Sequence, residues 1–184
     1  MSIFLINNYP YLTVDQVQGF SHSQPSSVLK SLVEASIASS AKAGISVNPK
    51  YYAEEGVLVV TVSVKAAAEG LFNVGAWLLE DGIYGMQEDY NNIGDSSYNT
   101  HENCVRIADS KYKGTWFGHS LGSLNAGDAA TKTFVMKVKK DWKLENLHLA
   151  VFASYGEKDG DKLVYSVCNA VDAPIDAPTP FEYK

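Results

Sequence analysis

Residues 118–122, Gly-His-Ser-Leu-Gly, match the pattern Gly-x-Ser-x-Gly. In serine hydrolases this pattern forms a nucleophile elbow, in which a sharp turn between a strand and a helix exposes the serine hydroxyl. Partners for a triad follow in the required order, because Asp128 or Asp141 precedes His148. The pattern therefore raises the hypothesis that Ser120 is a catalytic nucleophile.

The sequence around Ser120 favours a structural role instead. The residues that follow, GSLNAGDAATK, contain two glycines and no helical apolar face, and the chain then enters a predicted strand. An elbow needs a helix directly after the serine. His148 lies between Leu147 and Leu149 in another predicted strand. We therefore expect Ser120 to lie in a glycine-rich loop between strands, with a serine hydrolase using Ser120 and His148 as the alternative.

Other side chains offer less chemistry. The loop 87–99 carries Glu88, Asp89 and Asp95, whose oxygens suit calcium, but it lacks the residue order and closing glutamate of an EF-hand loop. Turn chemistry explains Glu80-Asp81 before a glycine without a paired acid site. The histidines fall at no zinc-ligand spacing: His22, His101, His119 and His148. We therefore expect no catalytic residue, cofactor or metal, and a metal-assisted site near His101 is kept only as a variant of the hydrolase alternative.

Composition limits the partners. The chain has 184 residues, a net charge of −6 and a pI near 5.1, which disfavour a broad nucleic-acid surface. The one dense basic run, residues 137–143, is better explained as a solvent-exposed strand end. No segment approaches the ~20 apolar residues of a membrane helix. The N-terminus has neither the preceding basic residues nor the cleavage site of a signal peptide.

The pattern of apolar residues predicts strand after strand. Alternation with period two is typical of sheets with one packed face. In the first long strand it places Val60 and Val62 in the core and Thr61 and Ser63 outside. The expected strands are 57–65, 72–80, 104–108, 131–139, 146–155 and 162–171. Glycine-rich and aspartate-rich turns separate them, so the sequence predicts a mainly β fold, an antiparallel β-sandwich that is immunoglobulin-like or jelly-roll-like.

One helix is predicted, over residues 25–43, after a short strand in YPYLTVDQV. Its apolar face consists of Leu29, Leu32, Val33 and Ile37. Pro25 suits its first turn and Gly44 the position after its end. We accordingly expect an N-terminal segment over residues 1–50, a β-sandwich over 51–173 and an extended tail over 174–184 that leaves the fold. Cys104 and Cys168 match no metal or redox spacing and are expected to be unpaired, with one disulfide between them as the alternative if their strands lie side by side.

Several segments, taken in order, carry a family resemblance. They are AWLLEDGIYGMQ (76–87), YNTHENCVRIAD (98–109), a Trp-Phe-Gly loop, DWKLENLHLAVF (141–152) and VYSVCNAV (164–171). Together they resemble the twenty-eight-kilodalton outer-membrane lipoprotein family of anaerobic Gram-negative bacteria, over residues 57–171. Residues 102–104, Glu-Asn-Cys, depart from the histidine-rich segment of that family.

The resemblance implies a lipid-anchored envelope protein at the surface or on the periplasmic face, and a role in adhesion or capture of a partner. It also implies that residues 1–50 are the last piece of a thioredoxin-like domain, whose redox cysteines are not in this sequence. We expect a non-enzymatic module with a protein or glycan partner, no nucleic acid, and membrane contact only through an anchor outside this chain. Its candidate partner-binding residues are Tyr84, Tyr90, Tyr98, His101, Tyr112 and Trp116.

Overall fold

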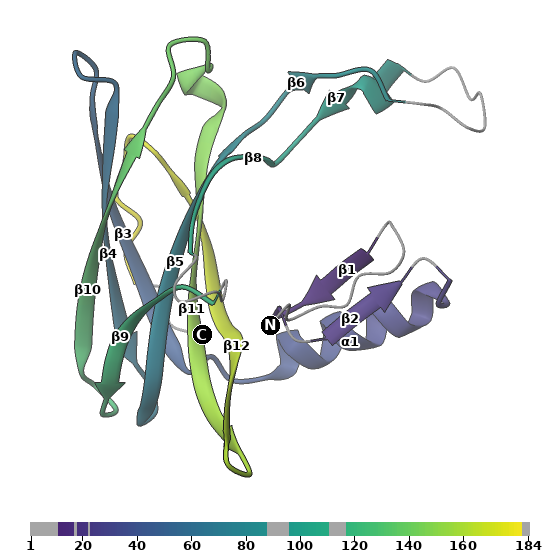
Figure 1. Cartoon of the computed structure of the whole chain (residues 1–184), viewed down its shortest axis with the longest axis vertical. Helices are drawn as coiled ribbons and strands as arrows, with labels where there is room; N and C mark the ends of the chain where they lie inside the picture. The colour runs from purple at the N-terminus through teal and green to yellow at the C-terminus, as the bar shows by residue number, and fades with distance from the viewer. Residues whose placement is uncertain (1–10, 17, 22, 88–95, 111–116, 182–184) are drawn as a thin grey trace.

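A computed structural model shows a mainly β fold built from two antiparallel sheets (Figure 1). It describes residues 11–16, 18–21, 23–87, 96–110 and 117–181. The sheets face each other as two layers and do not close into a barrel, which confirms the predicted β-sandwich. A hairpin-and-helix unit and a second short hairpin project from the same side of this sandwich (Figure 1).

The smaller sheet has the order β10-β4-β3, comprising β3 (Ala43–Tyr52), β4 (Val57–Ala66) and β10 (Ala129–Lys137). Strand β4 lies in the centre and pairs along its whole length with both neighbours. Its burial alternates strictly, so that Val60 and Val62 are fully buried and Thr61 and Ser63 face outward. The face assignment predicted from the sequence is therefore confirmed.

The larger sheet has the order β12-β11-β5-β8, and β9 also pairs with β5. Its strands are β5 (Gly70–Glu80), β8 (Cys104–Asp109), β9 (His119–Leu124), β11 (Leu147–Asp159) and β12 (Lys162–Pro174). One edge of β5 pairs with β11, and the other pairs with β9 along its first half and with β8 along its second half. Strand β5 is therefore the member that holds this sheet together.

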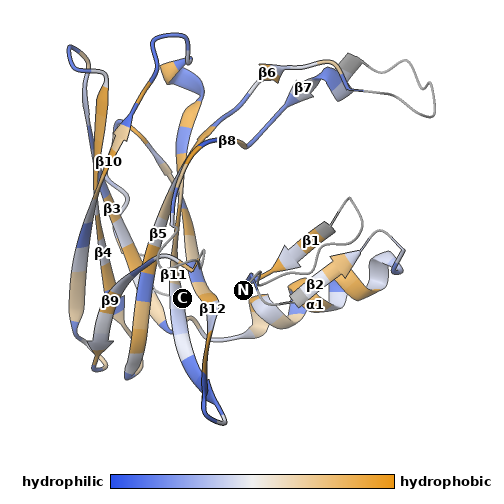
Figure 2. Ribbon diagram, viewed as in Figure 1, coloured by the Kyte–Doolittle hydropathy of each residue, from blue (hydrophilic) through white to orange (hydrophobic). Residues whose placement is uncertain are grey.

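The core lies between the inner faces of the two sheets. Side chains from β5 and β11 at alternate positions meet those from β4 and β10, as the period-two pattern predicts. Figure 2 shows the resulting hydrophobic positions along the facing strands. The largest fully buried side chains are Phe72, Phe134, Leu58, Leu78, Met136 and Leu149.

Strand β3 was missed by the sequence analysis. The predicted N-terminal segment ends at residue 50, yet residues 43–52 pair with β4 and bury Ile45 and Val47. The expected boundary thus passes through a sandwich strand. The reason is that Pro49 and the polar residues around it interrupt the alternation, while an edge strand tolerates a missing N–H donor.

The predicted helix is present but shorter. Helix α1 (Ser26–Ala38) begins directly after Pro25, as expected, and ends at Ser39 rather than near Gly44, which belongs to β3. Before it, β1 (Tyr11–Val14) and β2 (Gln18–Ser21) form a hairpin that was foreseen only in its first strand. None of the helix side chains is buried, and Ile37 on the predicted apolar face is 77% exposed.

The C-terminal tail does not leave the fold. The N–H of Thr179 donates to the Val47 carbonyl at 2.8 Å, and the Val47 N–H donates back to the Thr179 carbonyl at 2.9 Å. Ile175 is buried in the core. The prolines of the tail disfavour a regular strand, but Thr179 lies between two of them and still forms an isolated antiparallel bridge with Val47 at the edge of β3.

Both cysteines are free, as predicted. Cys104 begins β8, next to Glu80 of β5, whereas Cys168 lies in β12 at the opposite edge of the sheet. Strands β11 and β5 lie between the two cysteines, so each thiol packs independently of the other.

The opposite faces of β4 give a direct test of this core. Val62→Asp would bury an unpaired carboxylate where Val62 is now fully buried, and we expect it to lower the free energy of unfolding by several kcal/mol. The matched variant Thr61→Asp places the same group on the outer face and should cost far less. Urea denaturation followed by circular dichroism measures both, and equal losses would contradict the face assignment.

Candidate functional site

Ser120 lies in a strand, so the predicted loop is wrong. Strand β9 pairs with β5 through His119↔Val74 and Ser120↔Asn73, and the register then shifts so that Gly122 lies opposite Phe72. The bulge leaves the Ser120 side chain exposed, and its hydroxyl accepts a hydrogen bond from the Gly122 N–H at 3.2 Å. The glycines that suggested a loop in fact allow an irregular strand.

Each glycine of the pattern has a backbone reason. Gly118 has φ +98°, and a Cβ there would lie 2.5 Å from the backbone of Val74, so only glycine lets the chain approach β5 this closely. Gly122 has φ +86° at the bulge, a conformation that other residues rarely adopt. The Gly-x-Ser-x-Gly match is therefore explained by strand pairing.

The geometry separates Ser120 from the proposed histidine. Ser120 pairs with Asn73 on one edge of β5, whereas His148 pairs with Leu79 on the other edge. The six residue steps from Asn73 to Leu79 along β5 span about 20 Å. His119 lies 2.7 Å from Asp109, but it packs against Phe134 of the opposite sheet, on the other face of β9 from Ser120. Among the residues that the structure describes, no triad is brought together at Ser120.

We expect Ser120→Ala to change the free energy of unfolding by less than about 0.5 kcal/mol, because the side chain is exposed and bonds only locally. A fluorophosphonate probe, which labels activated serines, should leave Ser120 unmodified in intact-mass spectra. Stoichiometric labelling of Ser120 that is abolished by His148→Ala would contradict this interpretation.

The candidate binding residues fall partly on one projecting hairpin, which we call the arm: residues 83–87 and 96–101. It contains β6 (Ile83–Tyr84), the short 3₁₀ helix η1 (Ser96–Asn99) and β7 (Thr100–His101). Figure 1 shows it extending away from the sandwich beyond β8. The structure brings together Tyr84, Tyr98 and His101 there, while Tyr90, Tyr112 and Trp116 lie outside the described residues.

The arm presents apolar side chains to solvent. Tyr84 is 72% exposed, Met86 88% and Tyr98 43%. Met86 was missed by sequence reasoning, because a lone methionine in a polar stretch gives no periodic signal. Such exposed aromatic and methionine side chains are typical of partner-binding surfaces.

Hydrogen bonds join the two described chains of the arm to each other. The Gly85 N–H donates to the Asn99 carbonyl at 2.9 Å, and the Gln87 N–H donates to the Asn99 side-chain oxygen at 2.9 Å. His101 donates from Nε2 to the Gly85 carbonyl at 3.0 Å, so its ring supports the hairpin. His101 is therefore a structural residue of the arm, whereas the side chains of Tyr84 and Tyr98 are exposed on it.

Polar bonds anchor the arm to the sandwich at its root. The Gly82 N–H donates to the Glu102 carboxylate at 3.0 Å, and the Asn103 N–H donates to Asp81 Oδ1 at 2.7 Å. Asn146 donates from its side chain to the Asp81 carbonyl at 3.0 Å. The first two bonds join the two chains at the root of the arm to each other, and the third joins the first of these chains to the segment before β11.

Glu80, which precedes Asp81 in the sequence, is a buried structural carboxylate. It is 3% exposed, and it accepts hydrogen bonds from Arg106 Nε at 2.7 Å and from the Lys143 N–H at 3.0 Å. The Arg106 guanidinium in turn lies over the Trp142 ring, 5.4 Å from its centroid. Because both oxygens of Glu80 are engaged, these contacts assign the Glu-Asp pair to structure rather than to acid–base chemistry.

His148 bridges two carboxylates at the same root. Its Nδ1 lies 2.7 Å from Asp172 of β12, and its Nε2 lies 3.4 Å from Asp81. Burial of the ring opposes protonation, but the hydrogen bond and charge of Asp172 and the charge of Asp81 outweigh it and raise the pKa of His148 above 6.5. The Asn103 N–H, with His148 as a further contributor, lowers the pKa of Asp81.

This bridge predicts a pH dependence of stability. The raised pKa of His148 means that its stabilisation is complete below about pH 6.5, the unfolded-state pKa, and is lost as pH rises through the folded-state pKa. The lowered pKa of Asp81 means that its contribution holds above about pH 3.9 and is lost on acidification. His148→Asn should therefore destabilise the protein more at about pH 5.5 than at about pH 8.5.

Urea denaturation at the two pH values measures this difference, and Asp172→Asn should show the same trend because it removes one partner of the ring. If the loss of unfolding free energy in His148→Asn were the same at both pH values, the charged bridge would not contribute.

Two further features bear on the site. Among the described residues, no group of three or more histidine, cysteine, aspartate or glutamate side chains is arranged to hold a metal ion. The calcium ligands considered from the sequence, Glu88, Asp89 and Asp95, lie outside the described residues. No helix in the described part of the chain combines the length and apolar character needed to cross a bilayer.

The structure defines an antiparallel β-sandwich domain with an N-terminal hairpin and helix. The chain belongs to the Omp28 family: a sequence model described as outer membrane protein Omp28 matches residues 2–175. The family resemblance seen in the sequence is thus confirmed, and it places the protein at the outer membrane.

A solved structure shares the fold. HBP35 of Porphyromonas gingivalis superposes with a TM-score of 0.69 at 16% sequence identity, covering 94% of this chain and 55% of that chain. The present chain therefore spans little more than half the length of that protein. No curated protein matches the sequence.

Proposed function

We propose that this chain is a non-enzymatic binding or adhesion domain of an outer-membrane lipoprotein, and that the arm contacts its protein or glycan partner. The observation that carries the proposal is the exposure of Tyr84 and Met86 on a projecting hairpin whose described chains are joined by hydrogen bonds from Gly85 and Gln87 to Asn99. The exposed side chains provide apolar contact area, and the hydrogen bonds hold the segment that carries them.

Hydrogen bonds at the root of the arm support this role. They involve Asp81, Glu102 and Asn103, and they join the two chains of the arm where these leave the sandwich. A loop carried on a rigid scaffold is the usual arrangement of a recognition site. The family membership supports the location in the cell envelope. We further propose that a lipid anchor outside this chain holds the domain at the surface or on the periplasmic face of the outer membrane.

We also propose that the N-terminal unit is the last piece of a preceding thioredoxin-like domain. Helix α1 supports this, because Ile37 is 77% exposed and Val33 39% exposed on the face predicted to be packed. A helix normally covers such a face with another element. Pairing of β1 and β2 beside the helix gives the α/β character expected of such a fragment.

The arm can be tested with a double variant. Tyr84→Ser/Met86→Ser should weaken binding to the partner by about tenfold or more, since truncating exposed anchor residues commonly costs over 1 kcal/mol each. Binding of the biotinylated domain to a panel of purified extracellular-matrix proteins and to a glycan array identifies the partner, and interferometry measures the affinity.

The matched control is Val135→Ser on β10, which removes an apolar side chain that is 66% exposed on the sandwich itself. It should bind as the unchanged protein does. The proposal fails if no panel member binds, or if the control and the arm variant bind equally.

A further inference from the structure

A seam joins the N-terminal hairpin to the outer face of the larger sheet. The Val167 N–H of β12 donates to the Asp15 carbonyl at 3.0 Å, which holds the β1–β2 turn against the strand. Strand β12 is irregular at this point, because its register with β11 passes from Asn169 to Val167 and leaves Cys168 as the extra residue. The bulge and the turn thus face each other across the seam.

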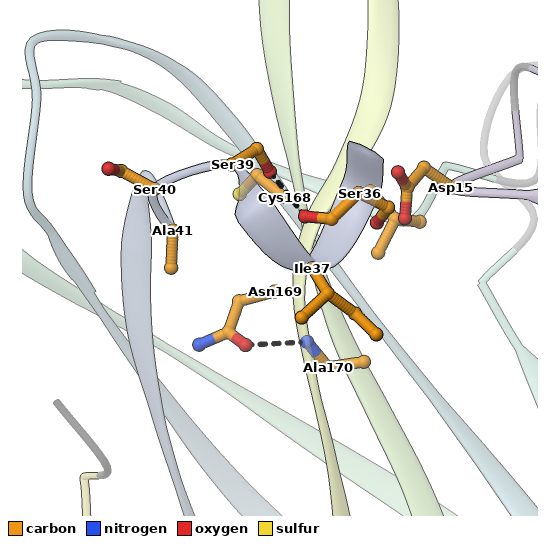
Figure 3. A pocket seen from close by; sticks show the side chains of 10 residues that line it. Asp15, Ser36, Ile37, Ser39, Ser40, Ala41, Cys168, Asn169 and Ala170 are labelled. Carbon is orange, nitrogen blue, oxygen red and sulfur yellow. Dashed lines mark hydrogen bonds between the residues drawn. The ribbon is translucent and has the colours of Figure 1, made fainter. Parts of the chain in front are cut away.

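Two adjoining cavities open along this seam. The larger, ≈ 440 Å³, is lined by serines of α1 and its C-terminal end and by β12, and the smaller, ≈ 280 Å³, lies over Trp77, Ala150 and Phe152. Both are lined by Asp15, Val167 and Ala170, so they meet at the turn. Figure 3 shows the larger one, with Ile37 of α1 pointing toward Ala170 of β12.

The floor of the smaller cavity is aromatic and fixed. Trp77 donates from Nε1 to the hydroxyl of Ser110 at 2.8 Å, and its ring meets Phe152 edge-on with centroids 5.7 Å apart. Ser110 is fully buried, so the indole cannot rotate without breaking a buried hydrogen bond. A ligand would therefore meet a preformed apolar surface on the outside of the sheet.

The charge at the seam is a single carboxylate. Asp15 is the one ionisable acid or base among the described lining residues apart from the Cys168 thiol, and burial raises the pKa of that thiol to about 11, which keeps it neutral. No described residue donates a hydrogen bond to the Asp15 carboxylate. The nearby ammonium of Lys42 is directed at Tyr155, 5.9 Å from the ring centroid.

The backbone around this carboxylate is unusual. Asp15 and Gln16 have φ of +54° and +59°, a left-handed turn formed without glycine. Side chains other than glycine are strained there, although aspartate and asparagine tolerate the conformation best. Glycine would relieve the strain, but it would remove the side chain that the turn directs to both cavities.

We propose that this seam binds a small organic cation that has an apolar body and an ammonium group. The ammonium pairs with Asp15, and the apolar body lies on Trp77 and Phe152, where an aromatic surface also favours a nearby cation. Charge complementarity favours this occupant, because a carboxylate that accepts no hydrogen bond from any described residue repels anions and attracts a cation more strongly than a neutral donor. The site is separate from the arm and independent of the function proposed for it.

The probe is 2-phenylethylammonium, titrated into the whole chain by calorimetry and compared with 2-phenylethanol and 3-phenylpropanoate. We expect the ammonium to bind about tenfold or more tightly than the alcohol, and the carboxylate not to bind. Asp15→Asn, which keeps a residue that tolerates the turn, should remove the preference for the ammonium over the alcohol. Ala150→Leu, which fills the smaller cavity, should abolish binding of both.

Asp161→Asn is the matched control, because it removes one carboxylate from the exposed turn between β11 and β12, and its binding should equal that of the unchanged chain. Circular dichroism melts verify that each variant is folded. Absence of ammonium binding, equal binding of the alcohol, or unaltered selectivity in folded Asp15→Asn would each overturn the proposal.

Discussion

The pairing of β5 and β11 is the interaction on which the rest of this structure depends. Ten residue pairs connect the two strands, from Glu80↔Leu147 to Leu71↔Gly156, and both strands contribute fully buried side chains to the core. Because β5 is eleven residues long, it also has room for two short partners, β9 and β8, in succession on its other edge. The close approach at Gly118 and the buried Glu80–Arg106 pair both serve this double use of one strand.

The sequence predicted the parts of the fold where one face is apolar and the other polar. Strand β4 is the clearest case, since the fully buried Val60 and Val62 alternate with Thr61 and Ser63. The same reasoning failed for β3 and β9, where a proline and glycines interrupt the alternation and the strand is recognised only through its neighbour. Local preference cannot show that a neighbour exists, so irregular strands require tertiary information.

The candidate sites show a similar division. The aromatic composition of the segment around Tyr84 and Tyr98 indicated a contact surface, and the structure places both on the arm. In contrast, Asp15 and Phe152 are far apart in the sequence, and their shared cavity arises only when the β1–β2 turn meets β12. The outer faces of β5 and β11 also carry apolar side chains, Trp77 and Phe152, but the alternation alone does not show what covers them.

The bridge between Thr179 and Val47 has a consequence for the solution behaviour of the sandwich. Strand β3 is the edge of the smaller sheet, and a long unpaired edge is a template on which another chain can add a strand. The tail occupies the N–H and the carbonyl of Val47, in the middle of that edge, with its own backbone. Two nearby prolines, Pro178 and Pro180, have no N–H to offer a further strand. The tail therefore protects this edge of the smaller sheet against pairing with another chain, and it also contributes Ile175 to the core.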